Sequence, residues 1–284
     1  MIDQPLPDTD AWVLSLSGHE IPVLRHTAQA LDELRPKAES VNARTLAGII
    51  LQDPLLTLRL FAHMAQHRRK TQLTDITTIE RTLLMIGIEP FFREFDQLSL
   101  IEDHLKAHPK ALLGLLRVVQ RSRRAAHWAR DWAIHRHDLE VEEITLAALL
   151  HDVADLMMWC FAPDLSLRVE AMKTENPQLR SVTAQVDVFG ITMLELQQAF
   201  VSYWGLPQLL TLLMDHSVND TPRVKNVALA VDLARHSAQG WEDAALPDDL
   251  KAIQALLRIN ADMLPIKLGV EPELLAPLLP SIAL

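Results

Sequence analysis

Prolines divide this chain into apolar stretches of helical length. The sixteen prolines stand singly, only eight glycines are present in 284 residues, and leucine and alanine dominate the stretches between the prolines. Leucine and alanine favour helices, whereas proline interrupts a helix unless it lies in the first turn. The alternating pattern of a half-buried strand is almost absent. The sequence therefore predicts an all-α fold.

The helices expected before residue 90 are short. Apolar residues at helical spacing predict four of them, and two have recognisable starts. Asp53 is placed to cap a helix whose first turn contains Pro54. Thr77-Thr78-Ile79-Glu80 has the spacing of a capping box ahead of another helix, which Gly87 is placed to end.

Longer helices are expected after Pro109, and the polar stretch 102–109 separates the two groups. The apolar spacing predicts long helices at about 111–135, 142–161 and 181–204, and shorter ones near 207–216 and 223–238. The expected organisation is an N-terminal extension at 1–20, a helical subdomain at 21–104, a helical bundle at 105–240 and a C-terminal helical extension at 241–284.

Composition excludes several classes of protein. A formal net charge of −10 without a long basic run argues against a nucleic-acid partner. The N-terminus lacks the pattern of a signal peptide, and we find no uninterrupted apolar run of the ~18–20 residues that a membrane helix needs. Phosphate-binding loops, His-Glu-x-x-His helices and Gly-x-Ser-x-Gly elbows are absent from the sequence. We expect a soluble cytoplasmic protein with no membrane partner.

The single cysteine, Cys160, excludes an intramolecular disulfide and a thiolate-rich metal site. It lies between Trp159 and Phe161 in an apolar stretch. A nucleophilic thiol needs a lowered pKa and a neighbouring base. We therefore expect Cys160 to be an inert core residue.

His151 and Asp152 form the most informative motif, an adjacent pair in the stretch predicted as a helix over 142–161. Imidazole and carboxylate groups bind divalent metals, but an ion held by two protein groups alone keeps most of its water and binds weakly. Neighbouring helical residues are separated by ~100° around the helix axis. Further ligands must therefore come from other helices, and the pair alone also fits a hydrogen-bonded helix surface.

Several segments, taken in order and spacing, resemble the HDOD family, over about 21–238. They are Ile21-Pro22-Val23-Leu24, the stretches 49–60 and 76–87, Leu149-Leu150-His151-Asp152, Trp204-Gly205-Leu206-Pro207 and the helix containing Asp232. This family is a branch of the HD superfamily that lacks the full catalytic set and is associated with bacterial signalling. The resemblance implies an HD-superfamily-like helical bundle with the N-terminal short helices packed on it.

The resemblance also implies a degenerate metal site. Catalytic HD proteins carry a histidine about thirty residues before the pair, where this chain has Arg121, and a second one at the position of Met193. Ala154-Asp155 stands where metal-dependent relatives commonly have Gly-Lys. We expect no metal, no cofactor and no catalytic residue, with the Arg121 guanidinium pairing with acids in place of an ion. The vestigial cluster comprises Arg121, His151, Asp152, Met193, His216 and Asp232.

The resemblance favours a non-enzymatic bacterial regulatory module that binds an unidentified signalling protein or senses a small ligand. The alternative is a metal-dependent HD-type phosphohydrolase or phosphodiesterase with an unusual metal site, and metal content distinguishes the two. A third hypothesis is a small-molecule binding protein that uses the vestigial cleft. A ligand that copurifies with the protein would identify this third class.

Overall fold

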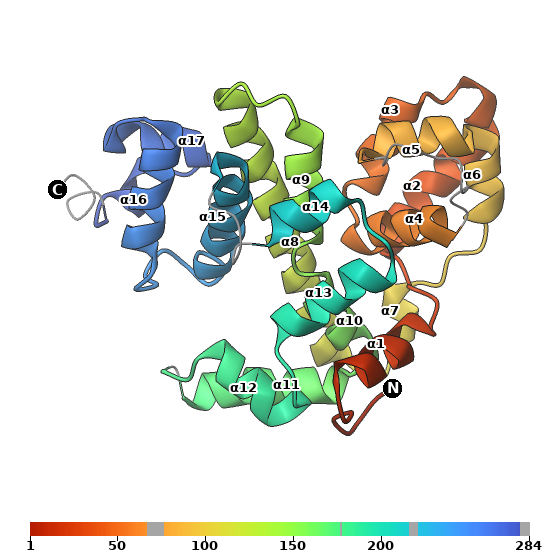
Figure 1. Ribbon diagram of the computed structural model, residues 1–284, viewed down its shortest axis with the longest axis horizontal. Coiled ribbons are helices and arrows are strands. Elements are labelled where there is room, and N and C mark those ends of the chain that lie inside the picture. The colour runs from red at the N-terminus through yellow and green to blue at the C-terminus, as the bar shows by residue number, and fades with distance from the viewer. Residues whose placement is uncertain (67–76, 177, 216–220, 279–284) are drawn as a thin grey trace. The chain divides into compact units, whose positions relative to one another are not determined.

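The computed structural model describes residues 1–66, 77–176, 178–215 and 221–278, and within these ranges all regular secondary structure is helical apart from one isolated β-bridge between Val23 and Leu100 (Figure 1). The predicted all-α fold is confirmed. The chain forms two compact units, unit 1 with residues 1–119 and 152–207, and unit 2 with residues 120–151 and 208–284. The predicted ranges, with a division at 104/105, do not coincide with these units.

Unit 1 contains the short N-terminal helices and the helices that they cover. In α10 every residue except the half-buried Asp155 is buried, so neighbouring elements must cover nearly all of its surface. Helix α4 packs on α10, as the sequence predicted for the short N-terminal helices. Helix α1, which the sequence analysis did not predict, packs on α13. The elements are α1 (Thr9–Ser17), α2 (Arg25–Leu34), η1 (Arg35–Ser40), α3 (Ala43–Ile50), α4 (Pro54–Gln66), α5 (Ile79–Ile86), α6 (Ile88–Glu94), α7 (Ile101–His104), the start of α8 (Pro109–His135), α10 (Val153–Phe161), α11 (Pro163–Glu175), α12 (Ser181–Phe189) and α13 (Met193–Tyr203).

Unit 2 contains the rest of α8 and the C-terminal helices. Helix α15 packs on α9, α14 and α16. The end of α16 is fixed by the residue that follows α8, because Arg136 Nη1 donates a hydrogen bond to the Leu256 carbonyl at 2.8 Å. Cationic side chains at a helix C-terminus are favourable. The elements are α9 (Val141–Leu150), α14 (Gln208–Met214), α15 (Pro222–His236), α16 (Leu246–Leu257), η2 (Ala261–Met263), α17 (Leu264–Leu268) and α18 (Pro272–Leu275).

Two of the predicted long helices are divided in the structure. The predicted helix over 181–204 is interrupted because Gly190 adopts a left-handed conformation (φ 76°) at the end of α12. The predicted helix over 142–161 is interrupted at His151 and Asp152. By length and composition, residues 141–161 are a candidate membrane-spanning segment, and the expectation that the sequence contains none is wrong on this criterion. However, 83% of the most apolar window of this segment is buried inside the protein.

Asp53 is a buried polar centre of the N-terminal helices. Its Oδ1 accepts hydrogen bonds from the backbone N–H groups of Leu55 (2.9 Å) and Leu56 (3.2 Å), which confirms the predicted cap at the start of α4. Its Oδ2 accepts a hydrogen bond from the Leu24 N–H at 2.8 Å, where α2 begins. Burial raises the pKa of the Asp53 carboxyl, and these hydrogen bonds oppose that shift. One carboxylate therefore joins two helix starts.

We predict that Asp53→Asn lowers the free energy of unfolding by about 1–3 kcal/mol, because an amide NH₂ cannot accept hydrogen bonds from both sides as the carboxylate does. Chemical denaturation at neutral pH measures the change. Asp8→Asn is the matched control, since the exposed Asp8 Oδ1 accepts only the Ala11 N–H at the start of α1 and asparagine caps a helix equally well. Equal stability of Asp53→Asn and the parent protein would contradict the assigned role.

Gly114 allows α8 to approach α10 closely. A β-carbon at this position would lie 2.5–2.8 Å from ring atoms of Trp159. Gly114→Ala should therefore cost about 1–3 kcal/mol through overpacking. Gly48→Ala in α3 is the control, because nothing lies within 4 Å of its β-carbon position and a helical alanine gains about 0.5–1 kcal/mol over glycine. Thermal unfolding should show opposite signs for the two substitutions, and stabilisation by both would disprove the close contact.

Candidate functional site

His151 and Asp152 lie in a turn between α9 and α10, not inside one helix. Asp152 leaves the helical conformation (φ −101°, ψ 22°), and α10 begins at Val153. Both side chains are half-buried. The Asp152 side chain makes no capping hydrogen bond at the start of α10. Another group must therefore cap this helix.

Gln197 of α13 supplies that cap. Its Oε1 accepts a hydrogen bond from the Ala154 N–H at 3.1 Å, in a buried environment. Met193 lies four residues before Gln197, and side chains at this spacing share one face of a helix. The Gln197 side chain reaches the start of α10 two residues after Asp152. The sequence analysis did not identify Gln197. The one indication in the sequence was a polar residue four positions after Met193, on a helix face that is otherwise apolar.

Met193 is the first residue of α13 and is held by its neighbours. Thr192 and Glu195 form a capping box, in which the Thr192 Oγ1 accepts the Glu195 N–H at 3.1 Å and Glu195 Oε2 accepts the Thr192 N–H at 2.8 Å. The hydrogen bonds from Thr192 lower the pKa of the Glu195 carboxyl. The Met193 N–H donates a hydrogen bond to Gln185 Oε1 at 3.3 Å. The position of the expected imidazole thus carries a thioether on a firmly capped helix.

The remaining members of the predicted cluster belong to unit 2 or lie outside the described residues. Arg121 is half-buried on α8, and His151 ends α9. Asp232 of α15 forms an ion pair of 3.3 Å with Arg235, one turn further along the helix. His216 lies outside the described residues. The predicted cluster as a whole, including the pairing of Arg121 with an acid, therefore remains a prediction.

The unit 1 residues at this position fit a divalent ion poorly. Asp152 supplies one carboxylate, Met193 a soft thioether, and the Gln197 carbonyl oxygen is already engaged by Ala154. Hard divalent ions require several oxygen or nitrogen ligands. Within the described ranges, no group of three or more His, Cys, Asp or Glu side chains is placed to hold a metal ion.

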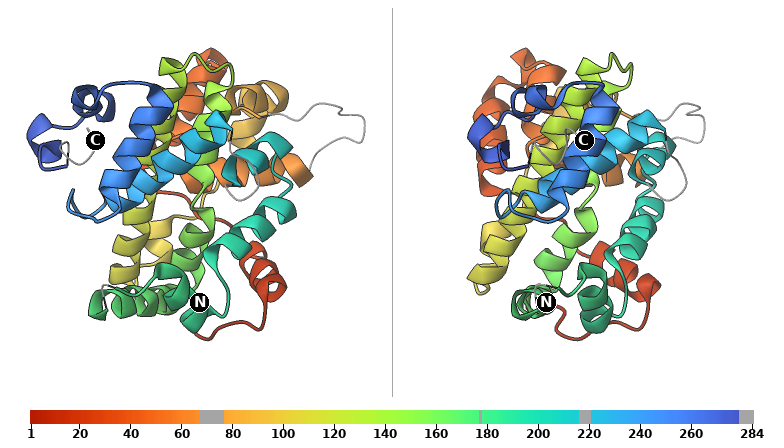
Figure 2. Two further views of the ribbon diagram at one scale, coloured as in Figure 1. Left: turned by 60° about the vertical axis from the view of Figure 1, so that its left-hand side comes forward. Right: turned by 90° about the vertical axis from the view of Figure 1, so that its left-hand side faces the viewer.

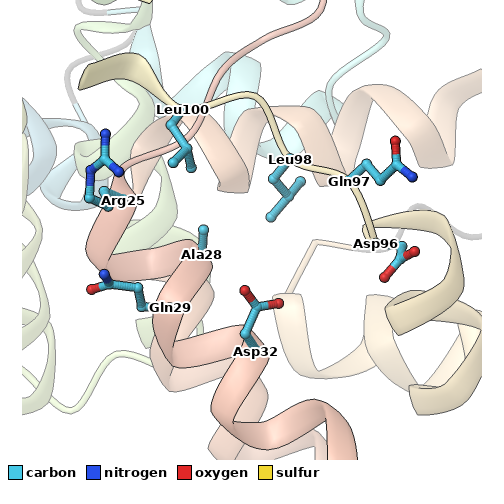
Figure 3. A pocket seen from close by; sticks show the side chains of 8 residues that line it. All are labelled: Arg25, Ala28, Gln29, Asp32, Asp96, Gln97, Leu98 and Leu100. Atoms are coloured by element: carbon cyan, nitrogen blue, oxygen red, sulfur yellow. The ribbon is translucent and has the colours of Figure 1, made fainter. Parts of the chain in front are cut away.

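A surface hollow of about 310 Å³ lies between α2 and the segment 96–100 (Figure 3). Its charged groups are paired within the protein. Arg25 forms an ion pair of 2.6 Å with Asp103, and Arg35 pairs with Asp96 at 2.5 Å and Asp32 at 3.2 Å. The hollow therefore offers a ligand mainly amide groups and an apolar floor. Its lining residues are Arg25, Ala28, Gln29, Asp32, Asp96, Gln97, Leu98 and Leu100.

Cys160 is fully buried in α10, and burial raises the pKa of its thiol far above the usual range. The protonated thiol is a poor nucleophile. The prediction of an inert core cysteine is confirmed.

The family is decided by a sequence comparison. The profile of the HDOD domain matches residues 21–219. The chain belongs to the HDOD family. This confirms the resemblance inferred from the motifs, and residues 1–20 and 220–284 lie outside the matched range. No curated protein sequence matches the chain.

Solved structures share the fold of this HDOD protein at low sequence identity. The response regulator MmoQ from Methylococcus capsulatus is 22% identical, with 92% of this chain and 98% of that chain covered and a TM-score of 0.60. A virulence factor from Campylobacter jejuni is 17% identical, with 98% of each chain covered and a TM-score of 0.66. At these identities the similarity establishes the fold alone.

We predict that Gln197→Ala lowers the free energy of unfolding by about 1–3 kcal/mol, because the buried Ala154 N–H loses its partner. Gln198→Ala is the control, since Gln198 is exposed on the next position of α13. Urea denaturation of both variants measures the difference. If the two substitutions have equal effects, Gln197 does not cap α10.

Proposed function

We propose that this HDOD protein is a non-enzymatic regulatory module that binds a signalling protein or senses a small ligand. The observation that carries the proposal is the hydrogen bond between Gln197 and the Ala154 N–H, with Met193 on the same face of α13. The helix on which the family resemblance expects a metal ligand, at Met193, is thus joined to the start of α10 by an amide hydrogen bond from a neighbouring turn.

The comparisons support a regulatory role by analogy. MmoQ is a response regulator, and its fold is shared over nearly the whole of both chains. The partner is proposed to be a protein or a small ligand rather than a nucleic acid, because the net charge of −10 would repel phosphates. A cytoplasmic location belongs to the same proposal. It is supported by the sparse use of cysteine, since the chain has one cysteine, Cys160, and it is buried.

The second candidate is a metal-dependent HD-type phosphohydrolase with an unusual metal site. The retained pair His151 and Asp152 favours it, together with His216 and Asp232 in the sequence. A metal site built on these four residues would lack the two histidine ligands that the resemblance leads us to expect, because Arg121 and Met193 stand at their positions. We rank it second because missing ligands weaken metal binding strongly.

Metal content and hydrolysis decide between the two candidates. Protein produced in medium supplemented with iron, manganese and zinc is dialysed against a mild chelator and analysed by plasma mass spectrometry. It is then assayed with bis(p-nitrophenyl) phosphate and with nucleotides. The regulatory module should retain only substoichiometric metal, and its hydrolysis should equal that of a His151→Ala/Asp152→Ala variant. One retained ion per chain, or hydrolysis that the double variant lacks, would establish the enzyme instead.

A further inference from the structure

Residues 1–20, which precede the range matched by the family profile, contribute a helix to unit 1. This helix is α1, which lies beside α13 (Figure 2). Its residues Trp12, Val13 and Leu16 are buried, whereas Leu14 is exposed. A segment outside the matched range therefore covers a surface that the HDOD domain provides.

Trp12 and Leu16 anchor α1. Both side chains are fully buried, and residues four positions apart lie on one face of a helix. The Trp12 Nε1–H donates a hydrogen bond to the Phe189 carbonyl at 3.1 Å, and the Trp12 ring meets the Phe189 ring edge-on with centroids 6.2 Å apart. Phe189 is the last residue of α12, where carbonyl groups lack partners within the helix. We call α13 together with Phe189 the α1 site.

The α1 site is held in place by contacts that do not involve α1. Thr192 and Glu195 cap the start of α13, and Gln197 joins α13 to the Ala154 N–H of α10. Helix α12 packs on α11 and ends at Gly190, which adopts a left-handed conformation. A surface supported in this way remains formed when α1 leaves it.

Helix α1 is bounded by its own local contacts. Asp8 Oδ1 accepts a hydrogen bond from the Ala11 N–H at 2.8 Å where the helix begins. The Gly18 N–H donates to the Leu14 carbonyl at 3.2 Å where the helix ends. Short helices gain most of their stability from packing against other elements rather than from their own hydrogen bonds. Helix α1 can therefore dock and undock as one body.

Separate attachments on both sides of α1 keep it near its site. The Ile2 N–H donates a hydrogen bond to the Phe161 carbonyl at 2.7 Å, and the His19 ring stacks on the Phe161 ring with centroids 5.0 Å apart. An undocked α1 would remain tethered at its site. Its competition with any other occupant of the site is therefore intramolecular.

We propose that the α1 site is the surface at which this module binds its protein partner, and that α1 occupies the site in the free protein. The partner is a helical segment with an aromatic residue and, four positions later, a leucine, because these are the side chains that the site receives from α1. Helix recognition commonly uses anchors at this spacing, and buried aromatic residues dominate the affinity of such contacts. The proposal rests on the regulatory function proposed above and names the class of partner for it.

Competition in the full chain tests the proposal. A fluorescein-labelled peptide with the sequence of residues 7–18 is titrated with the parent protein and with Trp12→Ala/Leu16→Ala, and binding is followed by fluorescence anisotropy. The peptide should bind the double variant at least about tenfold more tightly, because in the parent protein the tethered α1 competes at an effective concentration of the order of millimolar. Leu14→Ala, which changes an exposed residue of α1, is the control and should behave as the parent protein.

Equal affinity of the peptide for the parent protein and the double variant, or binding to neither, would overturn the proposal. It is also overturned if a peptide with alanine in place of both anchors binds the double variant as tightly as the original peptide does.

Hydrogen exchange of the parent protein keeps the test decisive where the double variant does not fold. The protection factors of the α1 amides should be at least about tenfold lower than those of the α13 amides, because α1 opens locally while α13 stays formed. Equal protection of the two helices would show that α1 leaves its site only when unit 1 unfolds, and the proposal would then be wrong. Metal content and hydrolysis test the regulatory function separately, so either proposal can fail alone.

Discussion

The near-complete burial of α10 is the constraint on which unit 1 depends. Eight of its nine residues are buried and only Asp155 is half-buried, so nearly all of its surface requires a neighbour. The Trp159 ring packs where Gly114 of α8 has no side chain, and Phe161 is covered by the rings of His19 and His104 and by the hydrogen bond from the Ile2 N–H. Gln197 satisfies a backbone N–H at its start. A helix as apolar as α10 can be stable in water only when its ends and sides are covered in this way.

Under the proposed function, the same constraint explains how an HD motif persists without an HD metal. In a metal enzyme the ion itself ties the helices that carry its ligands, and its loss leaves polar groups to be satisfied. Here the start of α10 is joined to α13 by an amide hydrogen bond, and α13 is stabilised by its own capping box at Thr192 and Glu195.

The helix pattern was predictable from sequence because it depends on local chemistry. Asp53 was identified as a cap, and its spacing to Pro54 is a local signal. Its second bond, to the Leu24 N–H, joins residues that are 29 positions apart, and no spacing indicates it. The turn at His151 and Asp152 was missed because apolar residues continue on both sides, and α1 was missed although Asp8, Trp12 and Leu16 offered a cap and an apolar face. The capping role of Gln197 could not be predicted, because it depends on the packing of α13 against α10, which the sequence does not show.

Hydrogen exchange of the α10 amides, with and without a strong chelator, tests most directly whether protein contacts rather than a metal ion hold α10. The backbone N–H groups of Val153–Phe161 should be among the slowest to exchange in unit 1, and their rates should be unchanged by the chelator. Faster exchange of these amides after chelation would show that an ion fixes the start of α10, and would contradict the account.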